Sequence, residues 1–166
     1  MLHVYLAGFD VFRPDALQQG EALKALCAEA GLQGLYPLDN RLPPGLEGND
    51  AAQWIYQQNV ALIRRCDGVL ANLNPFRGHE PDSGTAFEVG MAVAWGKPVW
   101  AWFEPAGALI DQVPHDSLGL DAQGFSVENF GLPRNLMLAC SWSGYSANAR
   151  AGAQALASFL KGERSG

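Results

Sequence analysis

Glu88 has the most unusual surroundings of any acidic residue in this sequence. The spacing predicts a helix over 82–95, in which the positions around Glu88 are small or apolar and include Gly84, Thr85, Met91, Ala92 and Trp95. No Lys or Arg stands three or four positions away to pair with the carboxylate. A carboxylate on such a face is costly unless it is hydrogen-bonded, and burial raises its pKa. Glu88 is therefore a candidate catalytic acid, with a solvated helix edge as the equally weighted alternative.

Asp82 precedes Glu88 by six residues and stands where the same helix should begin. An aspartate at this position ordinarily caps the helix, and capping alone would explain Asp82. Two acids in the first turns of one helix could nevertheless flank one small ligand. Glycosyl chemistry needs this arrangement, since one acid attacks the anomeric carbon and another group manages the proton of the leaving group. The spacing alone does not select that chemistry.

The motifs of common cofactor sites are missing from the sequence. A dinucleotide fingerprint needs G-x-G-x-x-G after the first strand, whereas YLAGFDVF offers one glycine, and no glycine-rich stretch has the spacing and lysine of a P-loop. The histidines are scattered, at His3, His79 and His115. The cysteines are odd in number and far apart, at Cys27, Cys66 and Cys140. We therefore expect no metal site and no cofactor, and we interpret the cysteines as reduced, mostly buried thiols.

Composition narrows the class of protein further. The 166 residues are 48% hydrophobic and 17% charged, which is ordinary for one globular domain. The formal net charge of −6 and the pI near 4.9 disfavour binding to a phosphate backbone. No apolar run approaches 18 residues, and the first residues lack the basic start of a signal peptide. We therefore expect a cytoplasmic protein that binds neither nucleic acid nor a membrane.

Short apolar runs alternate with segments of helical period, the pattern of a parallel sheet wrapped by helices. The predicted strands are 2–7, 32–38, 67–73, 97–103 and a short one at 140–142. The predicted helices are 14–30, 51–66 capped by Asp50, 82–95, a short one at 132–139 and an Ala-rich one ending at Leu160. The stretches 39–49 and 104–129 are expected to be loops. The pattern predicts one α/β domain over residues 1–162, followed by a frayed tail at 163–166.

Ligands of open α/β sheets bind beyond the carboxyl ends of the strands. Polar or small residues follow three of the predicted strands, namely Gly8 to Asp10, Asp39 with Asn40, and Asn74 to Ser83. The sequence therefore predicts a ligand site built from these three segments. A long loop such as 104–129 is also more often functional than idle.

Four segments, taken in order, resemble the nucleoside 2-deoxyribosyltransferase family. They are YLAGFDVF, YPLDN, NLNPFRGHEPDSGTAFEVGMAVAWGKPV and FGLPRNLML, which span about Val4 to Leu138. The resemblance implies a flavodoxin-like, doubly wound parallel sheet of about five strands. It also implies transfer of a 2-deoxyribosyl group between nucleobases without a metal or a diffusible cofactor, from a deoxynucleoside donor to a free nucleobase acceptor.

The resemblance implies roles for individual residues. Glu88 matches the glutamate that attacks C1′ and holds a covalent deoxyribosyl intermediate, and Asp82 matches the acid that exchanges a proton with the base. Tyr5 matches a tyrosine whose hydroxyl lies against the nucleophile. Asn135 matches an asparagine that reaches the sugar in a neighbouring subunit, so the site would be complete only in a homo-oligomer. Asn59 stands where some relatives carry an active-site aspartate, which leaves base handling open.

The resemblance extends the predicted substrate site to small and polar residues around these groups. The predicted substrate-binding residues are Gly8, Asp39, Asn40, Asn59 and Gly84, together with Asn135 from the neighbouring subunit.

Two other functions stay open. A sister group with the same fold hydrolyses deoxynucleoside 5′-monophosphates and carries a serine where this chain has Asp82. A carboxylate there repels a phosphate dianion and suits a neutral nucleoside, which favours the transferase. Arg77 and His79 could still meet a phosphate. A nucleoside-binding module without turnover is the third possibility, and the set of Glu88, Asp82 and Tyr5 argues against it.

Overall fold

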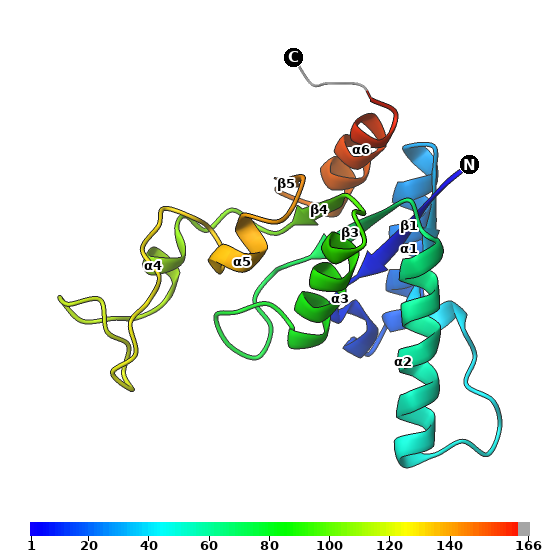
Figure 1. Ribbon diagram of the computed structural model, residues 1–166, viewed down its shortest axis with the longest axis horizontal. Coiled ribbons are helices and arrows are strands. Elements are labelled where there is room, and N and C mark those ends of the chain that lie inside the picture. Colours follow the sequence, from blue (N-terminus) through cyan, green and yellow to red (C-terminus); the bar gives the residue numbers. More distant parts are fainter. Residues whose placement is uncertain (163–166) are drawn as a thin grey trace.

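The computed structural model describes residues 1–162, so the predicted tail at 163–166 lies outside the described residues. Five parallel strands form one sheet in the order β2-β1-β3-β4-β5 (Figure 1). The strands are β1 (Leu2–Ala7), β2 (Leu32–Leu35), β3 (Gly68–Asn72), β4 (Val99–Trp102) and β5 (Gly144–Ser146). This is the flavodoxin-like strand order, in which the winding reverses between β1 and β3. The predicted fold class is confirmed.

Helices cover both faces of the sheet. They are α1 (Ala16–Glu29), α2 (Gly48–Arg65), α3 (Ser83–Ala94), α4 (Leu109–Gln112), α5 (Leu136–Ala139) and α6 (Ala149–Leu160), with single 3₁₀ turns η1 (Phe9–Phe12) and η2 (Pro37–Asp39). The α1 and α6 helices pack together on one face, and α2 and α3 pack on the other. The sheet is therefore buried on both sides, as interior parallel strands require.

The side chains of β1 divide between the two faces because successive residues of a strand point in opposite directions. Val4 and Leu6 join the core beneath α1 and α6, whereas Tyr5 and Ala7 join the core beneath α2 and α3. This alternation sends Tyr5, a fully buried residue, toward α3. Strand β1 thereby places a phenol under the helix that carries both acids.

Several predicted boundaries are wrong. The strand expected over 32–38 ends at Leu35, the loop expected over 104–129 contains α4, and the helix expected from residue 132 begins at Leu136. The fifth strand begins at Gly144 instead of residue 140, because the backbone amides of Ser141 and Trp142 still donate to Leu138 O at the end of α5. Pairing with β4 starts only where Ser143 N donates to Val99 O, at 2.7 Å. The helix expected from residue 51 begins at Gly48, so Asp50 lies within its first turn and is not its cap.

The segment 104–134 leaves the end of β4 and projects from the body of the molecule as an arm that carries α4 (Figure 1). Arg134, at the base of this arm, is fully buried. Its Nε donates to Leu73 O at 2.7 Å, its Nη1 donates to Gln112 Oε1 at 3.0 Å, and its guanidinium lies 4.1 Å from the ring centroid of Phe103. Arg134 therefore ties the arm to the carboxyl end of the sheet.

Candidate active site

Glu88 and Tyr5 meet although 83 residues separate them in the sequence. Tyr5 comes from the middle of β1 and Glu88 from the second turn of α3, which packs on the face of the sheet to which Tyr5 points. The Tyr5 hydroxyl donates a hydrogen bond of 2.7 Å to Glu88 Oε1. The predicted contact between these two side chains is present in the structure, and Glu88 is not at a fully solvated helix edge.

Burial and hydrogen bonding shift the pKa of Glu88 in opposite directions. Desolvation raises the pKa of the Glu88 carboxyl to about 7, the hydrogen bond from Tyr5 lowers this pKa, and the charge of Asp82 raises it. Desolvation and the Glu88 charge raise the pKa of Tyr5 above its ordinary value, so the phenol keeps its proton and remains a donor. Glu88 is consequently a carboxyl group that gains or loses its proton near neutral pH, as catalytic acids do.

Asp82 is the N-cap of α3 and also lines a cavity beside this helix. Its Oδ2 accepts hydrogen bonds from Thr85 N and from Thr85 Oγ1, both at 2.9 Å. The predicted helix cap is thus confirmed, and α3 closes at Gly96, where φ is +69°. A β-carbon at Gly84 would lie 3.2 Å from Asp82 Oδ2. The glycine therefore leaves room beside this carboxylate.

A cavity of about 390 Å³ opens at the carboxyl ends of β1 and β2, between η1, η2, α2 and α3. Most of its lining area is apolar, and the polar lining groups are few. The lining residues are Gly8, Val11, Phe12, Pro37, Leu38, Asn40, Leu42, Trp54, Ile55, Gln58, Asn59, Asp82, Gly84, Thr85 and Glu88. The structure thereby brings together six predicted site residues, Gly8, Asn40, Asn59, Asp82, Gly84 and Glu88, with Tyr5 bonded to the last of them.

Two predicted site residues lie elsewhere. The Asp39 carboxylate accepts hydrogen bonds from Lys24 Nζ at 2.7 Å and from Tyr36 N at 3.1 Å. It therefore links η2 to α1, and it does not line the cavity. Asn135 caps α5, and its Nδ2 donates to Glu128 Oε1 at 2.7 Å. It lines a separate hollow of about 480 Å³ on the other side of α3. Asn135 is therefore outside the Glu88 cavity of its own chain.

The sequence analysis did not predict that one face of α2 forms a wall of the cavity. Ile55 is 46% exposed and lines the cavity, whereas Leu62 and Ile63, further along the same helix, are buried. Trp54 and Gln58 line the same cavity four residues apart, as do Ile55 and Asn59. This four-residue spacing places both pairs on one helix face, and it is the signal that could have predicted the wall.

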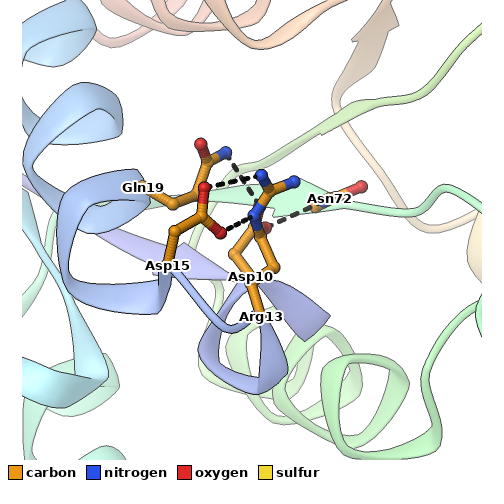
Figure 2. A network of polar contacts seen from close by, with 5 residues as sticks. All are labelled: Asp10, Arg13, Asp15, Gln19 and Asn72. Carbon is orange, nitrogen blue, oxygen red and sulfur yellow. Dashed lines mark hydrogen bonds and ion pairs between the residues drawn. The ribbon is translucent and has the colours of Figure 1, made fainter.

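Asp10 is a second residue whose role the sequence did not reveal. Its side chain is 3% exposed, and it accepts hydrogen bonds from Asn72 Nδ2 at 2.8 Å and from Gln19 Nε2 at 3.0 Å (Figure 2). The nearby Arg13 guanidinium pairs instead with Asp15. The bond from Asn72 joins the end of β3 to η1, the turn that follows β1 and Gly8. A β-carbon at Gly8 would lie 2.6 Å from Asp10 Oδ2, so this network requires glycine in the cavity wall.

The described residues contain no group of three or more His, Cys, Asp or Glu side chains placed to hold a metal ion. Within residues 1–162 the three thiols are free, and Cys140 is exposed where a mostly buried thiol was expected.

None of the described helices is both long and apolar enough to span a bilayer. The carboxyl groups that line the cavity are those of Asp82 and Glu88, and the Tyr5 phenol is hydrogen-bonded to the latter.

Comparison with known proteins supports the fold described above. Residues 4–137 match the model of the family described as nucleoside 2-deoxyribosyltransferase. The structure resembles a 2-deoxyribosyltransferase from Leishmania mexicana with a TM-score of 0.77 and 34% identity, over 97% of this chain and 98% of that one. It shares its fold with a 2-deoxyribosyltransferase from Bacillus psychrosaccharolyticus, with a TM-score of 0.63, 19% identity, and 90% and 88% of the two chains covered.

Curated relatives match over shorter stretches. An uncharacterized protein of Schizosaccharomyces pombe is 42% identical over 101 residues, which cover 58% of this chain and 47% of that protein. The mouse 5-hydroxymethyl-dUMP N-hydrolase is 35% identical over 63 residues, which cover 38% of this chain and 34% of the hydrolase. The chain thus matches less than half of the length of these relatives. The family match spans most of the chain, and by it this protein belongs to the nucleoside 2-deoxyribosyltransferase family.

Proposed function

We propose that this protein transfers a 2-deoxyribosyl group from a deoxynucleoside to a free nucleobase through a covalent intermediate on Glu88. In the first step a Glu88 carboxylate oxygen attacks C1′, the bond from C1′ to the base nitrogen breaks, and Asp82, which must enter this step in its neutral, protonated form, gives its proton to the departing base. In the second step the incoming base attacks C1′, the bond to Glu88 breaks, and Asp82 takes the proton from that base. Two displacements give net retention at C1′.

The pairing of Glu88 with Tyr5 in the cavity that Asp82 also lines is the observation that carries this proposal. A pKa of about 7 makes the ionised Glu88 a stronger nucleophile toward C1′ than an ordinary carboxylate, while the Tyr5 hydrogen bond keeps a useful fraction ionised. The mostly apolar cavity limits water at the intermediate, so a base competes well with hydrolysis. The family match supports the same reaction.

The test is an incubation with deoxyinosine, with and without adenine, in which the nucleosides are separated by chromatography. We expect deoxyadenosine only when adenine is present. Glu88→Ala should lower transfer about a thousandfold or more, because it removes the nucleophile. Glu104→Ala, which changes an exposed glutamate outside the cavity, is the matched control. Transfer by Glu88→Ala at near wild-type rates would remove Glu88 from this role.

Hydrolysis of a deoxynucleoside 5′-monophosphate is the second candidate. The partial match to the mouse hydrolase favours it, as does the exposed Arg77. The Arg77 guanidinium lies 5.5 Å from the ring centroid of Phe12, which lines the cavity, so an arginine stands near the cavity mouth. Asp82 opposes this reaction because its charge repels a phosphate. Base release from the monophosphate at the same rate with and without an acceptor base would establish the hydrolase.

We also propose that the working protein is a homo-oligomer in which Asn135 completes the site of a neighbouring subunit. The position of Asn135 outside its own Glu88 cavity supports this arrangement. A cytoplasmic role in recycling purine deoxyribonucleosides is the expected setting of the reaction.

A further inference from the structure

A chain of side-chain hydrogen bonds runs along the carboxyl edge of the sheet. Asp10, on η1, accepts from Gln19 Nε2 at 3.0 Å and from Asn72 Nδ2 at 2.8 Å (Figure 2). Asn72 Oδ1, at the end of β3, accepts in turn from Asn74 N at 3.1 Å and from Asn74 Nδ2 at 2.8 Å. Asn74 Oδ1 accepts from Glu104 N, just beyond β4, at 2.9 Å. We call these five residues the edge network, which connects α1, η1, β3 and the start of the arm.

The bonds at the centre of the edge network each have one allowed direction. A carboxylate only accepts, so Gln19 and Asn72 must both turn their NH2 groups toward Asp10. Asn72 then has only its oxygen left for Asn74, whose backbone amide can only donate. Asp10 and Asn72 are 3% and 2% exposed, so water does not replace a lost partner. Exchanging one donor for an acceptor therefore breaks a buried bond somewhere in the network.

The edge network holds the first residue of the segment that leads to Asp82. This segment, 74–81, joins β3 to α3. It closes on itself where Phe76 N donates to Glu80 O at 2.9 Å. Two residues beyond Glu80, Asp82 caps α3 and lines the cavity. The position of Asn74 therefore helps to set the position of Asp82.

Aromatic packing fastens the same segment to η1. The ring of Phe76 stacks on Phe9, with 4.9 Å between the ring centroids, and on Phe12, with 5.5 Å between them. Both partners belong to η1, the turn that also carries the carboxylate of the edge network. This turn therefore holds the segment directly at Phe76 and, through Asn72, at Asn74.

We propose that Asp10 and Asn72 are positioning residues that keep Asp82 within reach of the leaving base. This inference rests on the transferase proposed above, in which Asp82 protonates that base. Neither Asp10 nor Asn72 lines the cavity, so both act through the segment 74–81 and not on the substrate. An acid must lie within hydrogen-bond reach of its base, and a displacement of about 1 Å can cost about a hundredfold in rate. Loss of the edge network should therefore slow departures that need a proton more than departures that do not.

The test compares two donors that differ in this need. The base of 2′-deoxyguanosine takes a proton as it departs, whereas that of 7-methyl-2′-deoxyguanosine is already cationic at about pH 6 and departs neutral. Base release is measured in a single turnover with enzyme in excess and spontaneous release subtracted, so misfolded protein does not affect the ratio of the two rates. Asp10→Asn should raise the ratio of methylated to unmethylated donor about tenfold or more, as Asp82→Asn should. Asp15→Asn is the matched control, because it changes an exposed aspartate that pairs with Arg13, and it should leave the ratio unchanged (Figure 2).

A reciprocal exchange tests the central bond. In Asp10→Asn the new amide has one acceptor oxygen for the two donors, Gln19 and Asn72. Adding Asn72→Asp supplies a carboxylate that accepts both from the amide at position 10 and from Asn74. The double variant should therefore return the ratio to within about threefold of the wild type. A role in folding alone would lower stability and leave the ratio unchanged in every variant.

An unchanged ratio in Asp10→Asn, beside a raised ratio in Asp82→Asn, would overturn the inference and leave the transferase intact. An unchanged ratio in Asp82→Asn would remove Asp82 as the acid and overturn the inference with it. If Asp10→Asn does not fold, Asn74→Ala removes the half-buried link between Asn72 and Glu104 and should raise the same ratio. Absence of base release from either donor by the wild type would instead refute the proposed function, so the failures are distinguishable.

Discussion

Glu88 must combine burial with ionisation, and its neighbours determine the balance. Desolvation alone would favour the protonated carboxyl, which is a poor nucleophile. The hydrogen bond from the Tyr5 phenol favours the charged form, and the charge of Asp82 opposes it. Asp82 caps the helix by accepting two hydrogen bonds from Thr85, and these bonds fix its position relative to Glu88. The pKa of about 7 thus results from burial, the hydrogen bond from Tyr5 and the charge of Asp82.

Tyr5→Phe is expected to move the pH dependence of transfer. The reaction needs ionised Glu88, so the rate should rise with pH through about 7 in the wild type. Loss of the phenol removes the contact that lowers the pKa of Glu88, so the rising limb should move to higher pH. The measurement is kcat/KM from about pH 5 to pH 9. Tyr36→Phe is the matched control, since Tyr36 lies outside the cavity lining, and an unmoved limb in Tyr5→Phe would contradict this account.

At the scale of elements, the arm 104–134 depends on one buried arginine. Desolvation lowers the pKa of the Arg134 guanidinium, yet its Nε and Nη1 satisfy acceptors at the end of β3, on the α4 segment and at Pro133. The residue that follows is Asn135, whose side chain begins α5 and contacts Glu128. Arg134 therefore anchors the arm and also fixes the position of the neighbouring Asn135.

Arg134→Met should destabilise the protein by about 2–4 kcal/mol, because it leaves buried acceptors such as Leu73 O unpaired. Thermal or denaturant unfolding measures this loss, and amide exchange should show it concentrated in residues 104–140. Arg150→Met is the control, since its ion pair with Glu29 is exposed and should contribute less than about 1 kcal/mol. Equal stability of the Arg134 variant and the wild type would show that the arm is held by other contacts.

At the scale of the whole molecule, α3 separates two hollows. One side of this helix presents Glu88 to the cavity, and the other presents Val89, Gly90 and Val93 to the hollow that contains Asn135. Exposed apolar side chains lie along the arm and at α5, at Leu118, Phe125, Phe130 and Met137. An interface between subunits would cover these exposed apolar side chains. Asn135 begins α5, so such an interface is consistent with its proposed role in the site of a neighbouring subunit.

Mixing two inactive variants tests whether sites are shared. Glu88→Ala and Asn135→Ala should each transfer poorly, since each would remove one part of every site. Co-refolded or co-expressed together, they should recover about a quarter of wild-type activity, because random pairing rebuilds intact sites in mixed assemblies. No recovery, despite mixed assemblies shown by native mass spectrometry, would mean that Asn135 serves its own chain or none.

Much of the fold was predictable because its signals are local. Alternating apolar runs located the strands, although they did not give the end of α5, where two amides bond back to Leu138 and delay the fifth strand. Asp82 and Gly96 marked the ends of α3, since capping needs only residues within one turn. The resemblance correctly indicated the family, and the roles that it implies for Glu88, Asp82 and Asn135 stay predictions.

The sequence by itself determined the strand and helix order, the capped helix with its two acids, and the family. Only the tertiary structure decided which side chains meet across the sheet. It turned Asp39 toward Lys24, buried Arg134, bonded Asn72 to Asp10, and placed Trp54 and Gln58 in the cavity wall. The physical reason is range: periodicity and capping are encoded within a few residues, whereas contacts between distant residues depend on strand register and on how helices pack on the sheet.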